Sequence, residues 1–123
     1  MDCYTCQEAA GLRRSSRGPT IYEGRYWRVE HAYPCRLAGW LVLVLKRHAE
    51  AMHDLTPAEC AELGELQGRT ARTLAAVLVC EKEYVLGLAA AAPFHHIHVP
   101  VFAKPLAMPT RYCGDRTFVF FRP

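Results

Sequence analysis

One long helix with a well-defined start limits the folds that are open to this chain. Thr56 and Glu59 have the spacing of a capping box, in which each side chain satisfies a backbone N–H of the other residue, and Pro57 suits the first helical position. Apolar residues then recur at helical spacing and predict a helix from about residue 57 to residue 80 with one buried stripe. The stripe consists of Leu63, Leu66, Leu74, Val77 and Leu78.

Segments rich in β-branched and aromatic residues lie on both sides of this helix. A hairpin and a separate apolar strand, the latter covered on both faces, are expected before it, and two strands after it. The expected strands span residues 21–23, 26–31, 41–45, 84–88 and 94–102, and residues 117–121 suit an edge strand or a subunit contact. This order predicts an α+β fold, with the helix packed on one face of a mostly antiparallel sheet.

The length and composition are those of one globular domain. A chain of 123 residues, 51% hydrophobic and 22% charged, predicts a single domain over residues 1–123. The longest apolar stretch, residues 39–45, is far shorter than the ~20 residues that cross a bilayer, so no membrane association is expected. A net charge of +3 suits a phosphate-bearing ligand and is too small to indicate nucleic-acid binding.

Six cysteines are unusually many for a chain of this length. The first residues contain neither the basic nor the apolar region of an export signal, so a cytoplasmic location is expected. In a reducing compartment, cysteines serve as thiols or metal ligands more often than as a disulfide framework.

Half of the six histidines lie within residues 95–98. Because a strand sends successive side chains to opposite faces, His96, His98 and Pro100 are expected on one face, with His95 on the other as a structural residue. Two imidazoles about 7 Å apart along a strand can act as a nucleophile and its partner or as metal ligands. The spacing alone leaves an accidental cluster on an edge strand equally open.

The histidine segment and its surroundings resemble the histidine triad family of nucleotide-binding proteins, whose motif alternates three histidines with apolar residues. Residues 21–59 resemble the family's first strands and capped helix, and residues 80–88 resemble the strand before the triad. Cys3 and Cys6 resemble the Cys-x-x-Cys of its zinc-bearing branch, so the resemblance covers about residues 3–118. It implies an antiparallel sheet of about five strands with one long and one short helix, and a homodimer.

Two registers of the triad motif are open, and one triad histidine is missing in both. In the first, Phe94, His96 and His98 occupy the triad and His96 is the middle residue. In the second, His96, His98 and Pro100 occupy it and His98 is the middle residue. The second is preferred because it places Lys104 where the family has a downstream basic residue.

The resemblance implies chemistry in which the middle histidine attacks the α-phosphorus of a nucleotide and forms a nucleotidyl-histidine that water hydrolyses. His98 is therefore the expected nucleophile and His96 its catalytic neighbour. The substrates implied are a purine nucleotide, a dinucleoside polyphosphate or a nucleoside phosphoramidate. Pro100 and the alanines of residues 89–92 replace polar residues of the family, so a catalytically degenerate nucleotide sensor or interaction module is the alternative.

The resemblance also implies a structural Zn²⁺ site. A Cys-x-x-Cys pair supplies two thiolates to one tetrahedral ion and needs two further ligands. The zinc-bearing branch supplies them from two histidines, which correspond here to His48 and, in the preferred register, His96. The expected metal ligands are Cys3, Cys6, His48 and His96. The alternative is a pair of free thiols.

Overall fold

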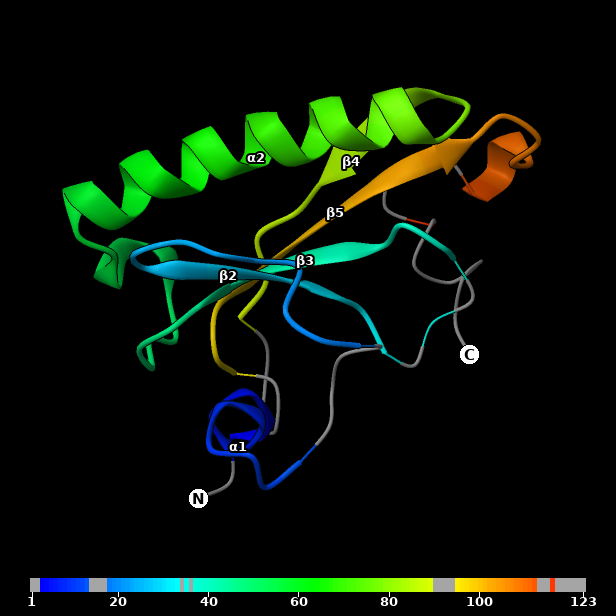
Figure 1. Cartoon of the computed structure of the whole chain (residues 1–123). Helices are drawn as coiled ribbons and strands as arrows, with labels where there is room; N and C mark the ends of the chain where they lie inside the picture. Colours follow the sequence, from blue (N-terminus) through cyan, green and yellow to red (C-terminus); the bar gives the residue numbers. More distant parts are fainter. Residues whose placement is uncertain are drawn as a thin grey trace.

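The computed structural model describes residues 3–13, 18–33, 35, 37–89, 95–112 and 116. The elements are α1 (Tyr4–Ala9), β1 (Tyr22–Glu23), β2 (Trp27–His31), β3 (Leu41–Leu45), α2 (Pro57–Val77), β4 (Cys80–Val85) and β5 (His98–Pro105), with 3-10 turns at Met52–Asp54 and Thr110–Tyr112. The strands of this described part form one antiparallel sheet in the order β1-β2-β3-β5-β4. The long helix α2 lies across one face and the short helix α1 lies on the other (Figure 1). The predicted α+β fold is confirmed.

The capping box that begins α2 is present as predicted. The Thr56 hydroxyl accepts from the backbone N–H of Glu59, and the Glu59 carboxylate accepts from that of Thr56 at 2.8 Å. The helix ends at Val77, before the predicted residue 80, because Leu78 has extended backbone with φ −114° and ψ 147°. Cys80 then begins β4, so the chain enters the sheet almost directly from the helix.

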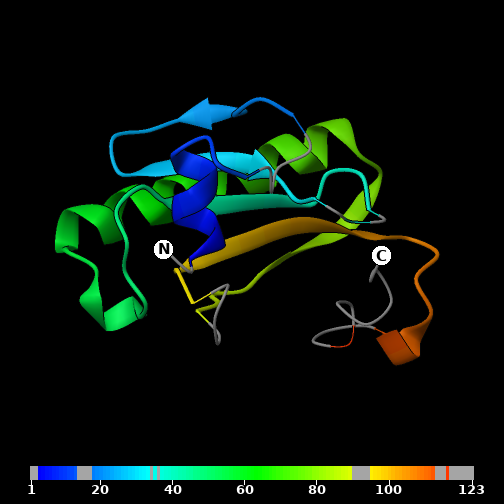
Figure 2. The same cartoon turned by 90° about the horizontal axis from the view of Figure 1, so that it is seen from below.

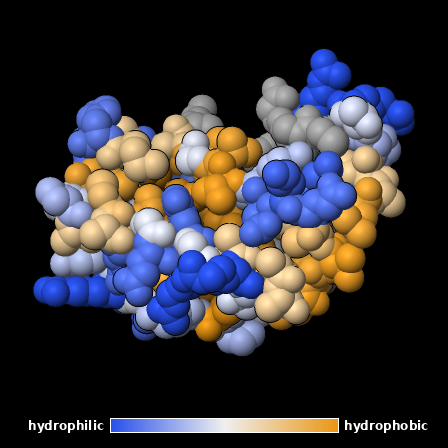
Figure 3. All heavy atoms as spheres, turned by 90° about the horizontal axis from the view of Figure 1, so that it is seen from above, coloured by the Kyte–Doolittle hydropathy of each residue, from blue (hydrophilic) through white to orange (hydrophobic). Residues whose placement is uncertain are grey.

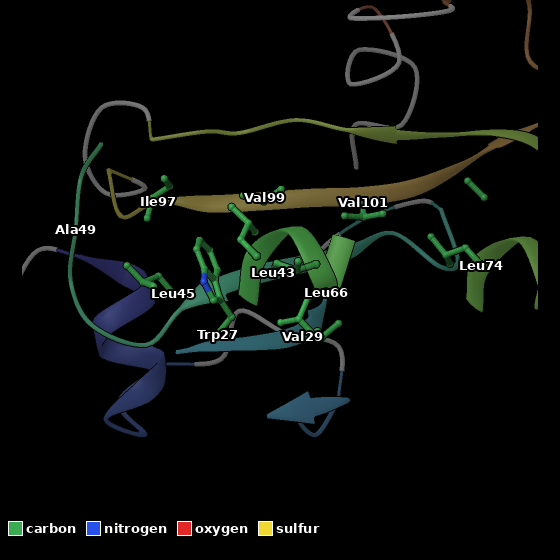
Figure 4. Packing of buried hydrophobic residues seen from close by; sticks show 12 residues of the cluster. Trp27, Val29, Leu43, Leu45, Ala49, Leu66, Leu74, Ile97, Val99 and Val101 are labelled. Atoms are coloured by element: carbon green, nitrogen blue, oxygen red, sulfur yellow. The ribbon is translucent and has the colours of Figure 1, made fainter. Parts of the chain in front are cut away.

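The hydrophobic core lies between α2 and one face of the sheet. Trp27, Leu43 and Leu45 are fully buried, and the Trp27 indole N–H donates to the backbone carbonyl of Glu59 at 3.0 Å. Cross-strand pairing of Trp27 with Leu45 and of Leu43 with Val99 places these side chains on the same face. Figure 4 shows them pointing into the space that Leu66 enters from α2. Alternation therefore directs His98 to the opposite face of the sheet.

The strand boundaries agree with the sequence in the first half of the sheet and differ in the second. The predicted hairpin and the strand Leu41–Leu45 are present, although the first two residues of this strand are only partly buried. The strand predicted over residues 84–88 begins earlier, at Cys80, and ends at Val85, leaving Leu88 in an isolated bridge to His98. Residues 117–121 lie outside the described residues.

The last strand, predicted from residue 94, begins only at His98 and continues to Pro105. Its start is delayed because the N–H of Ile97 donates to the carbonyl of Ala49, 2.8 Å away, instead of joining the ladder with β3. His96 therefore precedes the strand, and the prediction that His96 and His98 stand on one strand face is wrong.

The face of the molecule that carries α2 has both polar and apolar side chains on its surface (Figure 3). At the end of α2, Val77 is 74% exposed, so the prediction that it belongs to the buried stripe is wrong, and Val79 in the following turn is 81% exposed. In the described part of the chain, no helix has both the length and the hydropathy needed to span a bilayer.

The Arg47–Glu59 ion pair joins the end of β3 to the start of α2. The Arg47 guanidinium lies 2.7 and 2.9 Å from the two Glu59 oxygens, and the Glu59 side chain is 4% exposed. These hydrogen bonds, followed by those from Thr56, hold the pKa of Glu59 at about 2, below its ordinary value, against the opposing effect of burial. The ion pair therefore stabilises the fold only while Glu59 is ionised.

Glu59→Gln should lower the free energy of unfolding at pH 7 by about 1.5–3 kcal/mol, because it removes charge-assisted hydrogen bonds. The folded-state pKa is below that of the unfolded chain, so the stabilisation is present above about pH 4.3 and is lost as the pH falls toward 2. Urea unfolding of both proteins between pH 7 and pH 2 measures the difference, which should shrink on acidification. Glu65→Gln, on the exposed surface of the same helix, is the control. A difference that does not change with pH would contradict this prediction.

Candidate functional site

Helix α1 brings two cysteines to two histidines from distant parts of the chain. Cys3 is the N-cap of α1 and Cys6 lies one turn later, so their spacing places both thiols at the same end of the helix. This helix lies against the sheet face opposite α2, near the start of β5 (Figure 2). The ligand atoms of Cys3, Cys6, His48 and His96 all lie within 4.8 Å of one another.

The distances within this group suit a tetrahedral ion. The Cys6 sulfur is 3.3 Å from Nδ1 of His48 and 3.5 Å from Nδ1 of His96, and the Cys3 sulfur is 3.6 Å from Nδ1 of His96. Zinc bonds of about 2.3 Å to sulfur and 2.0–2.1 Å to nitrogen separate S and N ligands by about 3.5 Å in a tetrahedron. The four side chains thus offer the donor set and the spacing of a structural zinc site.

A hydrogen bond orients the ring of His96 with one nitrogen toward the cysteines. Its Nε2–H donates to the carbonyl of Leu45 at 2.7 Å, so the lone pair lies on Nδ1, which faces the cysteines. The residue is 1% exposed, and burial, the largest effect, lowers the pKa of its imidazole. The neutral ring that results is the form that binds metals.

The surroundings of Cys6 favour the protonated thiol. Burial, then the hydrogen bond and the charge of Cys3, raise the pKa of Cys6 to about 11, although the Arg28 charge lowers it. An ion that binds this thiol at neutral pH would have to displace its proton.

His98 lies outside this group but is joined to it through His96. Its Nδ1–H donates to the backbone carbonyl of His96 at 2.8 Å. This hydrogen bond fixes the tautomer, so Nε2 carries the lone pair. The side chain of His96 thus faces the cysteines while its carbonyl orients His98.

Pro100 follows His98 on the same face of β5. It is buried, pairs with Val42 of β3, and accepts a hydrogen bond from the N–H of Leu86 through its carbonyl. Its ring has no donor for a phosphate oxygen. The alanine-rich residues 90–92 and Phe94 lie outside the described residues.

A buried ion pair on the sheet face of His98 was not predicted from the sequence. Arg28 pairs with Val44, which pairs with His98, so the three side chains follow one another across that face. The Arg28 Nε is 3.6 Å from the Glu30 carboxylate and has no hydrogen-bond partner among the described residues. Burial raises the pKa of Glu30, although a hydrogen bond from Thr20 lowers it. The only signal in the sequence was the alternation of these two charged residues in an aromatic and β-branched segment.

The remaining histidines near the site differ in role. Both ring nitrogens of His31 are used between β2 and β3: Nδ1–H donates to Ala32 and Nε2 accepts from the N–H of Gly39. His95 instead lies beside His48, with ring centroids 5.2 Å apart and its Nε2 3.8 Å from the Glu50 carboxylate. The sequence predicted His95 only as a structural residue.

Comparison of the sequence with models of protein families and with curated proteins gave no match. Solved structures do match. A Zn-bound histidine triad family protein from Mycobacterium smegmatis is 20% identical in sequence, with a TM-score of 0.68. The match covers 93% of this chain and 84% of the Mycobacterium smegmatis chain. A member of the HIT (histidine triad) family from Bacillus subtilis is 16% identical with a TM-score of 0.69, covering 87% and 76%.

A HIT family hydrolase from Legionella pneumophila is 14% identical with a TM-score of 0.62, covering 89% of this chain and 98% of its own. These likenesses extend over most of each chain. At identities of 14–20% they establish the architecture alone. The chain has the fold of histidine triad proteins.

Proposed function

We propose that this chain binds a nucleotide by its phosphate groups and hydrolyses it through a nucleotidyl-His98 intermediate. The observation that carries the proposal is the 2.8 Å hydrogen bond from Nδ1–H of His98 to the carbonyl of His96. It leaves Nε2 with the lone pair that a nucleophilic imidazole needs. The fold shared with a HIT family hydrolase supports the same reaction class.

In the first step, Nε2 of His98 attacks the α-phosphorus and forms a P–N bond. The bond from this phosphorus to the leaving phosphate or amine breaks, and the leaving group takes the bonding electron pair. Water then attacks the same phosphorus, gives its proton to solvent and returns the electron pair of the P–N bond to His98. The positive charge on the ring of the intermediate is stabilised by the hydrogen bond from Nδ1–H to the His96 carbonyl.

The proposed substrates are a purine dinucleoside polyphosphate or a nucleoside phosphoramidate, both of which contain an α-phosphorus with a leaving group. Arg28 supplies positive charge on the sheet face of His98, although it shares that face with the buried Glu30. A catalytically degenerate nucleotide sensor is the second candidate, and Pro100 favours it because a proline side chain has no donor for the transition state.

We further propose that Cys3, Cys6, His48 and His96 bind one structural Zn²⁺. Four protein ligands make a closed site, whose ion links α1 to the start of β5 and contributes to folding. The ion holds the side chain of His96, and the carbonyl of the same residue holds His98. The metal site therefore positions the nucleophile without contacting the substrate.

Titration with AMP, together with phosphorus NMR of a diadenosine polyphosphate, tests the proposed function. AMP should bind at or below millimolar concentration, which corresponds to about 4 kcal/mol, and the polyphosphate should give AMP as a product. Absence of AMP binding at millimolar concentration would contradict both candidate functions. Binding without hydrolysis would favour the nucleotide sensor.

We also propose that two copies of this chain form a homodimer, with the edge strand β4 of each copy at the interface. This strand lies at an edge of the sheet; Val79 just before it is 81% exposed and Val85, its last residue, is 42% exposed. Val85→Lys should convert the dimer to a monomer, as measured by light scattering on a sizing column. Leu12→Lys, an exposed apolar residue after α1, should leave the dimer intact. A monomeric wild-type chain would contradict the proposal.

A further inference from the structure

The two proposed histidine ligands direct the same ring nitrogen toward the cysteines. Nδ1 of His96 and Nδ1 of His48 each lie 3.3–3.6 Å from a cysteine sulfur. A neutral imidazole that binds an ion through one nitrogen carries its proton on the other, and this N–H needs an acceptor to fix the ring. For His96 the acceptor is the carbonyl of Leu45.

For His48 the corresponding group is the carboxylate of Glu50. Nε2 of His48 lies 3.5 Å from Oε2 of Glu50, two residues further along the chain. The Glu50 side chain is 60% exposed, so a small rotation in solvent brings the two atoms to the usual hydrogen-bond distance of about 2.9 Å.

Glu50 also faces a second imidazole. Its other oxygen lies 3.8 Å from Nε2 of His95, and the ring of His95 meets that of His48 edge to face at 5.2 Å between centroids. The hydrogen bond from the N–H of Ile97 to the carbonyl of Ala49 holds the two segments side by side. The Glu50 carboxylate therefore lies between two rings on backbone segments that are joined by this hydrogen bond.

We propose that Glu50 is a positioning residue of the metal site, which accepts the Nε2–H of His48 and fixes the ring with Nδ1 toward the ion. His95 holds the second oxygen of the same carboxylate. The inference rests on the proposed zinc site and extends it from four ligands to the chain His48–Glu50–His95 on its exposed side. Carboxylates in this position orient the ring and increase the basicity of the ligating nitrogen.

A second ion is the competing interpretation, because His48, Glu50 and His95 offer ligand atoms within 4.8 Å of one another. One ring of His48 would then have to bind two ions, through Nδ1 and Nε2, and lose its last N–H proton. A second ion at Nε2 would displace the hydrogen bond to Glu50, so the two interpretations exclude each other at this atom. Of these three residues, we therefore assign His48 to the first ion as a ligand, Glu50 as the acceptor of its Nε2–H, and His95 as the second partner of the Glu50 carboxylate.

Zinc affinity of the full chain, measured by competition with a chromogenic chelator, tests the proposal. Glu50→Ala should weaken zinc binding about 10- to 100-fold, the usual effect of removing such a partner. Glu50→Gln keeps an acceptor oxygen and should lose less. Glu65→Ala, which removes an exposed carboxylate from the middle of α2, should bind as the wild type does.

The melting temperatures of the metal-free proteins show whether Glu50→Ala affects only the orientation of His48 or also the stability of the fold. The metal-free Glu50→Ala protein should melt as the metal-free wild type does, because this side chain is exposed. Unchanged zinc affinity in Glu50→Ala would overturn the positioning role. Two ions per wild-type chain, with one lost in His95→Ala, would overturn it in favour of a second metal site. A wild-type chain that binds no zinc would instead refute the zinc site itself and leave the proposed hydrolysis at His98 to its own test.

Discussion

A His98→Ala variant should hydrolyse a diadenosine polyphosphate at least about 1,000-fold more slowly than the wild-type chain, because it removes the nucleophile of a covalent mechanism. The fold should persist, since the ring of His98 is only partly buried and its one described hydrogen bond is to the carbonyl of His96. AMP affinity should change much less than turnover, because phosphate and base contacts do not depend on the nucleophile. Phosphorus NMR measures turnover and calorimetry measures AMP binding.

His53→Ala is the matched control for this substitution. The side chain of His53 is 87% exposed and lies beside the carboxylate of the neighbouring Asp54, so turnover should be unchanged. Undiminished turnover in His98→Ala would contradict the proposed mechanism. If His96→Ala alone lost turnover while retaining zinc, the first register of the triad motif would be correct and His96 would be the middle residue.

A Cys6→Ser variant should lose zinc and with it the attachment of α1 to the sheet. The Cys6 sulfur lies beside ring nitrogens of both His48 and His96, and structural zinc contributes several kcal/mol to folding. We expect substoichiometric zinc after purification and a lower melting temperature than the wild type. Turnover should also fall, because the carbonyl of His96 orients His98. Metal analysis and calorimetric melting measure these changes.

Cys60→Ser controls for the loss of a thiol, because Cys60 is exposed on α2, away from the metal group. Zinc affinity of the wild type should rise with pH, since the high pKa of Cys6 makes metal binding release a proton. Equal melting temperatures for the wild type in excess zinc and in chelator would contradict the structural role of the ion.

The sequence predicted the elements well where local chemistry determines them. The capping box of Thr56 and Glu59 begins α2 at the expected residue, and the apolar run Leu41–Leu45 is a strand. The predicted element boundaries were wrong where a long-range contact determines them. The hydrogen bond between Ile97 and Ala49 delays the start of β5, and no local pattern of residues encodes it.

The residues of the candidate site were predicted mainly from the resemblance to the histidine triad family and less from the spacing of cysteines and histidines in the sequence. Cys6 and His96 are 90 residues apart, and only the fold brings them to 3.5 Å. The resemblance named all four members of this group but could not show that the carbonyl of His96 orients His98. Arg28 and Glu50 were missed because isolated charged residues in a sequence are most often solvated.

Mass spectrometry of the intact protein during turnover tests covalent catalysis by His98 most directly. The reaction is quenched at alkaline pH, where phosphohistidine bonds survive, within the first turnovers on a diadenosine polyphosphate. The wild-type chain should gain the mass of one adenylyl group, which peptide mapping assigns to His98 and which His98→Ala lacks. Hydrolysis with no adduct at any time, or an adduct that persists in His98→Ala, would contradict nucleophilic catalysis by this residue.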